Sequence, residues 1–173
     1  SGYSVSLSSD GSKVAIGARY NNGNGVNDSG HVRVYQYNDV DTWTQLGQDI
    51  DGEAGRYYEG FVRIQTHDYS GWSVSLSSDG TIVAIGAPRN DGNEVGAGHV
   101  RVYQYNNTNS SWNQIGQDID GEAYVDYSGS SVSLSSDGTI VAIGAPRNDG
   151  NEDRLGHVRV YQYNNTNSSW NQI

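Results

Sequence analysis

The chain has 173 residues, among them 23 glycines and 13 tyrosines, and it contains neither cysteine nor methionine. With 20 Asp and Glu against 10 Lys and Arg, its net charge of −10 argues against nucleic acid and anionic lipid as partners, because both are bound by clustered cations. No stretch approaches the ~18 consecutive apolar residues of a membrane-inserted helix, and the lack of cysteine excludes disulfides, thiolate zinc sites and a cysteine nucleophile.

One hairpin-like sequence occurs three times, at 1–19, 70–88 and 128–146. Equivalent valines in the second and third copies are 58 residues apart, whereas those in the first and second copies are 69 apart. The 11 extra residues lie in an insertion within 55–69. Because the first copy begins at Ser1 itself, we expect a processed product or an excerpt of a longer protein.

Each copy predicts two antiparallel strands. In the third copy, Val132 and Leu134 alternate with serines, which indicates a strand with one apolar face. Ser136-Asp137-Gly138 then favours a tight turn, because Gly accepts positive φ and Asp can bond its own backbone. The β-branched run 139–145 is apolar on both faces and predicts a strand covered on two sides.

Two more strands follow in each unit. In unit two an exposed Asn/Asp/Gly loop at 90–93 precedes the alternating run 99–105, which predicts a third strand with valines on one face. A polar turn at 106–111 leads to a short fourth strand at 112–115, and 116–123 connects to the next unit.

A repeated unit of four strands that cannot bury both of its faces alone is typical of a β-propeller blade. We therefore predict an all-β array of three four-stranded antiparallel blades, at 1–54, 70–123 and 124–173, with an inserted loop at 55–69. Because closed propellers have ~4–8 blades, we expect the array to be part of a larger ring or of a homo-oligomer. The expected partners are further repeats of a longer chain or other copies of this one.

The hairpin sequence, VSLSSDGTIVAIGAP in the third unit, resembles the integrin-type FG-GAP repeat, a family of propeller blades. Its Gly-Ala-Pro element stands at 86–88 and 144–146, and as Gly-Ala-Arg at 17–19. The Phe-Gly position of the family is occupied by Ser-Gly at 70–71 and 128–129.

The resemblance also implies a calcium loop between the first two strands of a blade. Here that connection is only Ser-Ser-Asp-Gly, at 77–80 and 135–138, which offers too few of the ~6–8 oxygen ligands that calcium takes. The family's metal site is therefore not carried over.

A second acidic group could bind calcium instead. Its carboxylates alternate along Gly-containing connections between units, as in oxygen-ligand loops, although Asp-Gly pairs are also common in solvated turns. The candidate metal ligands are Asp118, Asp120, Glu122 and Asp126, with Asp49, Asp51 and Glu53 in unit one.

The histidines favour a structural interpretation. His31, His99 and His157 recur at the start of each third strand, and a catalytic site is rarely built in triplicate. His67, followed by Asp68 in the insertion, is the unrepeated histidine, and it leaves open an enzyme with an acid–base site there.

The aromatic residues of the third and fourth strands could stack on sugar rings, or could fill the space between blades. The candidate ligand-binding residues are Tyr103, Tyr105, Trp112, Tyr161, Tyr163 and Trp170. Glycosylation acceptor patterns occur at Asn27, Asn106, Asn109, Asn164 and Asn167, which suits a secreted or surface glycoprotein.

These features predict an extracellular or cell-surface, non-enzymatic repeat module for adhesion or surface-structure assembly, which binds an extracellular protein or glycan through its loops. Two alternatives remain open, a carbohydrate-binding lectin and an enzyme with its site in the insertion.

Overall fold

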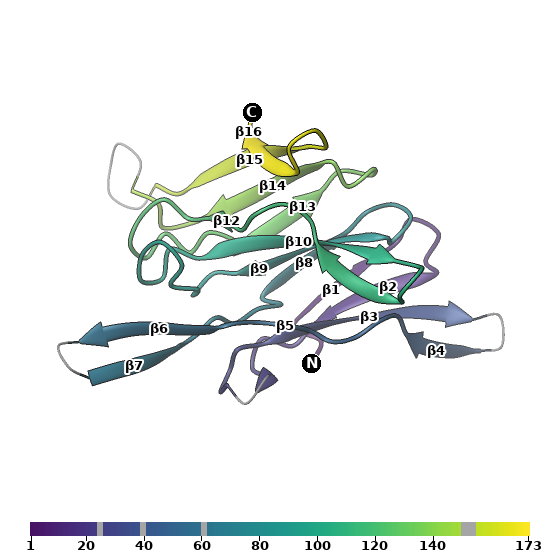
Figure 1. Ribbon diagram of the computed structural model, residues 1–173, viewed down its shortest axis with the longest axis horizontal. Helices are drawn as coiled ribbons and strands as arrows, with labels where there is room; N and C mark the ends of the chain where they lie inside the picture. Colours follow the sequence, from purple (N-terminus) through teal and green to yellow (C-terminus); the bar gives the residue numbers. More distant parts are fainter. Residues whose placement is uncertain (24–25, 39–40, 60–61, 150–154) are drawn as a thin grey trace.

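The computed structural model describes residues 1–23, 26–38, 41–59, 62–149 and 155–173, with backbone alone for 54–59 and 62–66. These residues form strands, turns and loops, and they include no helix of the length and apolarity that crossing a bilayer requires. Three antiparallel sheets, here called blades 1, 2 and 3, follow one another along the chain and stack on one another (Figure 1). The prediction of an all-β chain with three four-stranded antiparallel sheets is confirmed.

Within each blade the four strands pair in the order in which they occur in the chain, and a short fifth strand joins the third strand of blades 1 and 2. Blade 1 contains β1 (Ser4–Leu7), β2 (Lys13–Gly17), β3 (His31–Asn38), β4 (Thr42–Gln45) and β5 (Ile50–Asp51). Blade 2 contains β8 (Ser73–Leu76), β9 (Ile82–Ala87), β10 (His99–Asn106), β11 (Ser111–Gln114) and β12 (Ile119–Asp120). Blade 3 contains β13 (Ser131–Leu134), β14 (Ile140–Ala145), β15 (His157–Asn164) and β16 (Ser169–Gln172).

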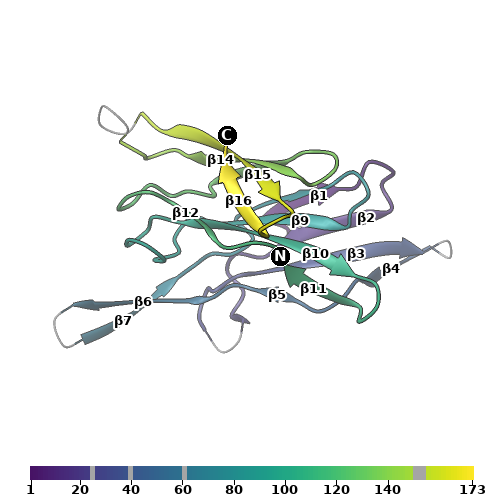
Figure 2. The same cartoon turned by 45° about the horizontal axis from the view of Figure 1, so that its top comes forward.

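The stretch expected as an inserted loop contains a further hairpin. β6 (Ala54–Glu59) pairs antiparallel with β7 (Val62–His67), and Ala54 lies opposite His67. Figures 1 and 2 both show this hairpin projecting away from the three blades. The pairing returns the chain to the blades at His67, directly before β8.

The first strands of the three blades, β1, β8 and β13, lie next to one another. The serines of their shared Ser-Val-Ser-Leu sequence connect them, because the hydroxyl of Ser6 accepts a bond from the Leu76 amide and that of Ser75 accepts one from the Leu134 amide, both at 3.0 Å. In β8 the alternation therefore has two uses: Val74 and Leu76 face the core, and Ser75 bonds the next blade.

The glycine of the Gly-Ala-Pro element lets the next blade approach closely. A Cβ placed on Gly86 would lie 2.1 Å from the carbonyl oxygen of Gly129, which no side chain could tolerate. Gly129 itself has φ of +86°, a conformation that favours glycine. The Ser73 hydroxyl donates to the same Gly129 carbonyl at 2.8 Å, so both Ser73 and Gly86 serve the junction between blades.

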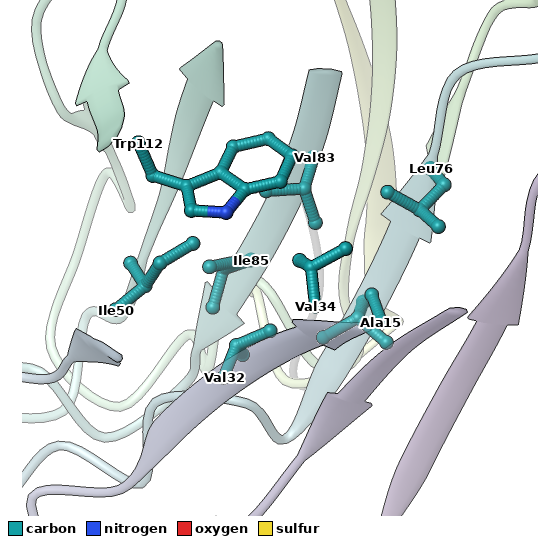
Figure 3. Close-up of a cluster of buried hydrophobic side chains, with 9 residues drawn as sticks. Ala15, Val32, Val34, Ile50, Leu76, Val83, Ile85 and Trp112 are labelled. Carbon is teal, nitrogen blue, oxygen red and sulfur yellow. The ribbon is translucent and has the colours of Figure 1, made fainter. Parts of the chain in front are cut away.

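The hydrophobic core lies between blades. At the first junction, Ala15, Val32 and Val34 of blade 1 face Val83 and Ile85 of blade 2, with Trp112 covering the group (Figure 3). The indole Nε1 of Trp112 donates to the Leu46 carbonyl at 2.7 Å, and Trp170 makes the equivalent bond to Ile115 at 3.0 Å. Each blade is therefore covered by its neighbour.

Candidate functional site

An ion-pair cluster connects blade 1 to blade 2. The guanidinium of Arg101 donates to both carboxylate oxygens of Asp118, at 2.9 and 2.6 Å, and lies 2.7 Å from the Glu53 carboxylate. Asp118 belongs to the same blade as Arg101, whereas Glu53 comes from the connection that leaves blade 1. Arg101 thus joins two blades through two charge-assisted contacts.

The equivalent arginines of the other two blades form only some of these contacts. Arg159 of blade 3 lies 3.2 Å from Glu122, which leaves blade 2, and donates to the Asp120 carbonyl at 2.8 Å. Arg33 of blade 1 pairs with Asp49 of its own blade at 2.6 Å.

The carboxylates predicted as one calcium loop are divided among different contacts. Asp118 bonds Arg101, Glu122 faces blade 3, and Asp126 is buried and accepts bonds from the amides of Glu122 and Ala123 and from the Asn148 side chain. The alternation of acids along the sequence does not predict these separate contacts, because the arginines that bind Asp118 and Glu122 come from other strands.

Within the part of the chain that the structure describes, two groups of side chains could hold a metal ion. They are His31 with Asp49 and Asp51, and His99 with Glu53 and Asp118, and in each the ligand atoms lie within 4.8 Å of one another. Burial, aided by the nearby Arg101 charge, lowers the pKa of His99 to about 4, so its ring is neutral at pH 7 and can act as a nitrogen ligand. Each group therefore pairs one imidazole with two carboxylates.

Asp68 is a buried carboxyl group at the base of the insertion, next to the first ion-pair cluster. One of its oxygens accepts a bond from the Glu53 amide at 2.7 Å, and the other, Oδ1, is buried without a hydrogen-bond partner among the described residues. Burial raises the pKa of Asp68 from 3.8 to about 7, because it disfavours the charged form.

We expect this carboxyl group to make folding pH-dependent. Between pH ~4 and ~7 the folded state binds a proton that the unfolded state has lost, so the free energy of unfolding should fall as the pH rises through this window. Asp68→Asn should remove that slope and make the protein more stable than wild type at pH 8, by on the order of 2 kcal/mol, while leaving pH 4 stability similar. Urea titrations at several pH values measure this, and parallel profiles for the two proteins would contradict it.

The aromatic residues predicted as a sugar site lie mainly between blades. Trp112 and Trp170 are each 3% exposed and their ring faces are covered by neighbouring side chains. Tyr161 is buried as well, and Tyr103, Tyr105 and Tyr163 pack against the same clusters. Trp43 is the equivalent tryptophan of blade 1. It is 46% exposed, because no blade covers its face of blade 1.

The predicted glycosylation acceptors lie on the surface. Asn106 and Asn164 end the third strands of blades 2 and 3, and their side-chain oxygens accept bonds from Thr108 and Thr166 at 2.8 Å. Asn27, Asn109 and Asn167 are exposed in loops.

Arginine and tyrosine side chains alternate across all three blades where the second strands end and the first strands begin. We call this set the Arg–Tyr row: Arg19, Tyr69, Arg89, Tyr127 and Arg147. The Arg89 guanidinium carbon lies 5.2 Å from the centre of the Tyr69 ring and 5.8 Å from that of Tyr127, and Arg147 lies 4.8 Å from Tyr127. These spacings are in the range of cation–π contact.

The Arg–Tyr row contains backbone strain at equivalent positions. Tyr69 and Tyr127 both have φ of 55°, which is uncommon for a residue with a side chain, and such strain gathers at functional sites. The sequence analysis missed the row, although a repeated arginine after Gly-Ala and a repeated tyrosine before Ser-Gly could have indicated it. The sequence alone does not show that these arginines and tyrosines lie next to one another, because they belong to different blades.

At one end of the Arg–Tyr row an aromatic cage surrounds Arg19. Its guanidinium carbon lies 3.7 Å from the Tyr3 ring centre, 4.1 Å from Trp72 and 4.3 Å from Tyr20. A surface hollow of about 460 Å³ opens beside it, and a second of about 360 Å³ opens beside Tyr127 and Arg147 at the other end. Both volumes suit a monosaccharide-sized ligand.

His67 lies beside Tyr69 of the Arg–Tyr row. Its ring stacks on Tyr69, with ring centres 5.8 Å apart and planes inclined by 16°. Its Nδ1 lies 2.9 Å from the Asn27 carbonyl oxygen and 3.9 Å from the Asp28 carboxylate, and the side chain is 41% exposed. The unrepeated histidine is thus next to a surface where arginines and aromatic rings converge.

Sheets of four strands stacked through their first strands define a β-propeller-type array. Residues 64–103 match the family model described as the FG-GAP repeat, which confirms the resemblance seen in the sequence. A comparison with curated protein sequences gives no match.

Solved structures share the fold over nearly the whole chain. A Bacteroides uniformis protein assigned as a 6-phosphogluconolactonase has a TM-score of 0.54 and 13% identity, over 97% of this chain and 38% of its own. The periplasmic gluconolactonase PpgL of Pseudomonas aeruginosa has a TM-score of 0.55 and 17% identity, over 92% of this chain and 39% of its own. Saccharomyces cerevisiae Sqt1 has a TM-score of 0.53 and 15% identity, over 98% of this chain and 33% of its own. The chain therefore spans between a third and two fifths of these proteins.

These similarities overturn the expectation of a non-enzymatic module for adhesion or surface assembly. That expectation, and the accompanying prediction that the chain is not an enzyme, were drawn from the repeat architecture. The same architecture occurs in lactonases, so it gives no ground for excluding catalysis.

Proposed function

We propose that this chain contributes a β-propeller site that hydrolyses the lactone of a polyhydroxylated acid, with His67 as general base and the Arg–Tyr row as binding surface. The observation that carries the proposal is the stacking of His67 on Tyr69, between Arg19 and Arg89. The lactonases of similar fold suggest the substrate class. The chain spans only part of the length of these lactonases. Both the substrate and the activity are therefore part of the proposal.

The hydrogen bond of His67 sets which of its nitrogens can act as a base. A carbonyl oxygen only accepts, so the 2.9 Å contact with Asn27 requires the proton on Nδ1 and leaves Nε2 with a free lone pair. Asp28, 3.9 Å from Nδ1, would stabilise the imidazolium that forms when Nε2 takes a proton. The tautomer is therefore the one that a general base needs.

The reaction needs only water as co-substrate. His67 Nε2 accepts a proton from water while the water oxygen attacks the lactone carbonyl carbon. The ring C–O bond then breaks, and the leaving alkoxide takes the proton back from His67, which gives the open hydroxy acid. Arg89 would stabilise the charge that develops on the carbonyl oxygen.

The test is lactone hydrolysis followed by acid release at constant pH, with glucono-δ-lactone as the probe and the spontaneous rate subtracted. His67→Gln should lower kcat by ~100-fold or more, because general-base catalysis contributes ~10²–10⁴. Arg89→Gln should raise KM by ~10-fold through loss of a charge-assisted contact.

The matched control is His157→Gln, since His157 is a partly exposed histidine in blade 3 whose Nε2 lies 3.8 Å from the Glu122 carboxylate. It should hydrolyse the lactone at the wild-type rate. A wild-type protein with no rate above background, or a His67→Gln variant that retains full activity, would refute the proposal.

Calcium is the ion that the sequence predicts for the acidic residues of the two groups that could hold a metal ion. Calcium prefers oxygen ligands, and at the Glu53–His99–Asp118 group one ligand would be nitrogen while Arg101 already neutralises both carboxylates. We therefore propose no calcium-dependent step, and we expect lactone hydrolysis to be unaffected by a chelator.

An extracellular or periplasmic location fits the proposed function. The five acceptor asparagines are on the surface, and one protein of similar fold is a periplasmic gluconolactonase. Glycan attachment at Asn106 or Asn164 would be detected as a mass shift removed by an endoglycosidase.

A further inference from the structure

The arginines whose side chains the structure describes fall into two sets by their place in the repeat. Those of the third strands form ion pairs with carboxylates: Arg33, Arg101 and Arg159. Those that follow the second strands contact tyrosine rings and, among the described residues, pair with no acidic side chain: Arg19, Arg89 and Arg147. In a chain with 20 acids and 10 bases, the second set is thus kept apart from the carboxylates.

The guanidinium groups of this second set can still donate hydrogen bonds. A cation–π contact uses the charge of a guanidinium and not its N–H groups. Arg89 and Arg147 are exposed, and within the described part of the chain their guanidinium groups make only ring contacts. Arg19 donates to the Tyr20 hydroxyl at 2.6 Å, while its Nε is buried and finds no partner there. Because N–H groups of this geometry match the two oxygens of a carboxylate, the Arg–Tyr row can bind carboxylates from outside the chain.

The arginines of the Arg–Tyr row recur with the blades. Arg89 and Arg147 are one repeat of 58 residues apart and share Tyr127, whose ring centre lies 5.8 and 4.8 Å from their guanidinium carbons. Arg19 and Arg89 share Tyr69 in the same way, at 6.0 and 5.2 Å. A ligand with a single carboxylate would need only one of these arginines. A chain molecule with carboxylates at regular intervals could use all three.

Exposed tyrosines beside the Arg–Tyr row favour a sugar as the carrier of these carboxylates. Tyr20, whose ring centre is 4.3 Å from the Arg19 guanidinium carbon, is 59% exposed, and Tyr124 is 67% exposed. Tyr124 lines the hollow of about 360 Å³ together with Tyr127 and Arg147. Exposed aromatic rings can stack on the C–H faces of sugars. Nucleic acid requires denser cations than one line of arginines in a chain of net charge −10.

We propose that the Arg–Tyr row binds an acidic oligosaccharide, a chain of uronic acid residues whose carboxylates bond Arg19, Arg89 and Arg147 in turn. This ligand deepens the proposed function and rests on it in one respect, since the lactone hydrolysed beside His67 would then stand at one end of such a chain. Binding of the chain itself requires no catalysis.

The test is calorimetric titration of the protein with the hexamer of galacturonic acid, a probe that contains no lactone. The fully methyl-esterified hexamer is the matched ligand control, because it differs in lacking the negative charges. Wild type should bind the free acid at least ~10-fold more tightly than the ester, since charge-assisted hydrogen bonds are the stronger ones. Added salt should weaken binding of the acid, because it screens exposed charges.

Two variants test the arginines themselves. Arg89→Gln and Arg147→Gln should each weaken binding of the acid by ~10-fold or more, through loss of a charge-assisted contact. The matched control is Arg33→Gln, which removes the same charge from a 40% exposed arginine that pairs with Asp49 outside the row. It should bind the acid as wild type does. Circular dichroism should be unchanged for both row variants, because Arg89 and Arg147 are exposed.

Failure of wild type to bind the acid, equal binding of acid and ester, or equal losses for Arg89→Gln and Arg33→Gln would overturn the proposal. Hexaglutamate tests an acidic peptide as the ligand, and binding as tight as that of the galacturonate hexamer would also overturn it. Binding and hydrolysis are measured on different compounds. A protein that binds the hexamer without hydrolysing glucono-δ-lactone would refute the proposed function alone, and the opposite result would refute this proposal alone.

Discussion

Replacing Trp112 by Ala is expected to lower the free energy of unfolding by about 3–5 kcal/mol, the cost of removing a large buried aromatic side chain. Trp112 is 3% exposed and covers the core between blades 1 and 2 (Figure 3). Its indole N–H also bonds the Leu46 carbonyl, and that acceptor would lose its partner. The loss should therefore exceed that of an aliphatic truncation.

Urea unfolding followed by tryptophan fluorescence and circular dichroism measures this change. Asn113→Ala is the matched control, because Asn113 is exposed on the same strand and its truncation should cost less than ~0.5 kcal/mol. A Trp112→Ala variant within 1 kcal/mol of wild type would show that the blades do not depend on each other for stability.

Replacing Arg101 by Ala should also be strongly destabilising, by about 3–5 kcal/mol. The Arg101 side chain is 14% exposed and holds Asp118 and Glu53 together across the junction. Its removal leaves the half-buried Asp118 carboxylate without its cation, and this unpaired charge is the main reason for the cost.

The chain contains its own control for Arg101. Arg33 occupies the equivalent position in blade 1, where its side chain is 40% exposed and forms an ion pair with Asp49 of its own blade. Because solvent screens this pair, Arg33→Ala should cost less than ~1 kcal/mol. Equal losses for the two variants would contradict the view that the contact between blades, and not the repeat position, gives Arg101 its effect.

The strand pattern could be predicted from the sequence because it depends on local chemistry. Ser-Val-Ser-Leu alternates, and the following Asp-Gly turn is closed by Asp79, whose carboxylate accepts bonds from Ser77 and Thr81 at 2.7 to 3.0 Å. These contacts join residues within two positions of each other. The choice of strand and turn was therefore available without knowledge of the neighbouring blades.

The role of each acid, histidine and aromatic ring could not be predicted in this way. Trp43 and Trp112 occupy equivalent positions, yet one is 46% and the other 3% exposed. Likewise Glu53 and Asp118 are 65 positions apart in the chain but share one arginine. From a periodic sequence one predicts the same environment for equivalent residues of every copy. In a stacked array, equivalent residues of the outer and the middle blades have different environments.

By itself the sequence determined the three blades, the order of their strands and the Gly-Ala element at each junction, because these follow from hydrophobic period, turn chemistry and the steric freedom of glycine. Only the tertiary structure decided that the tryptophans are core residues, that the acids serve different blades, and that His67 lies among the arginines and tyrosines of the row. The physical reason is that each of these environments is made by residues from two or more separate strands, and their distances are set by how whole sheets pack.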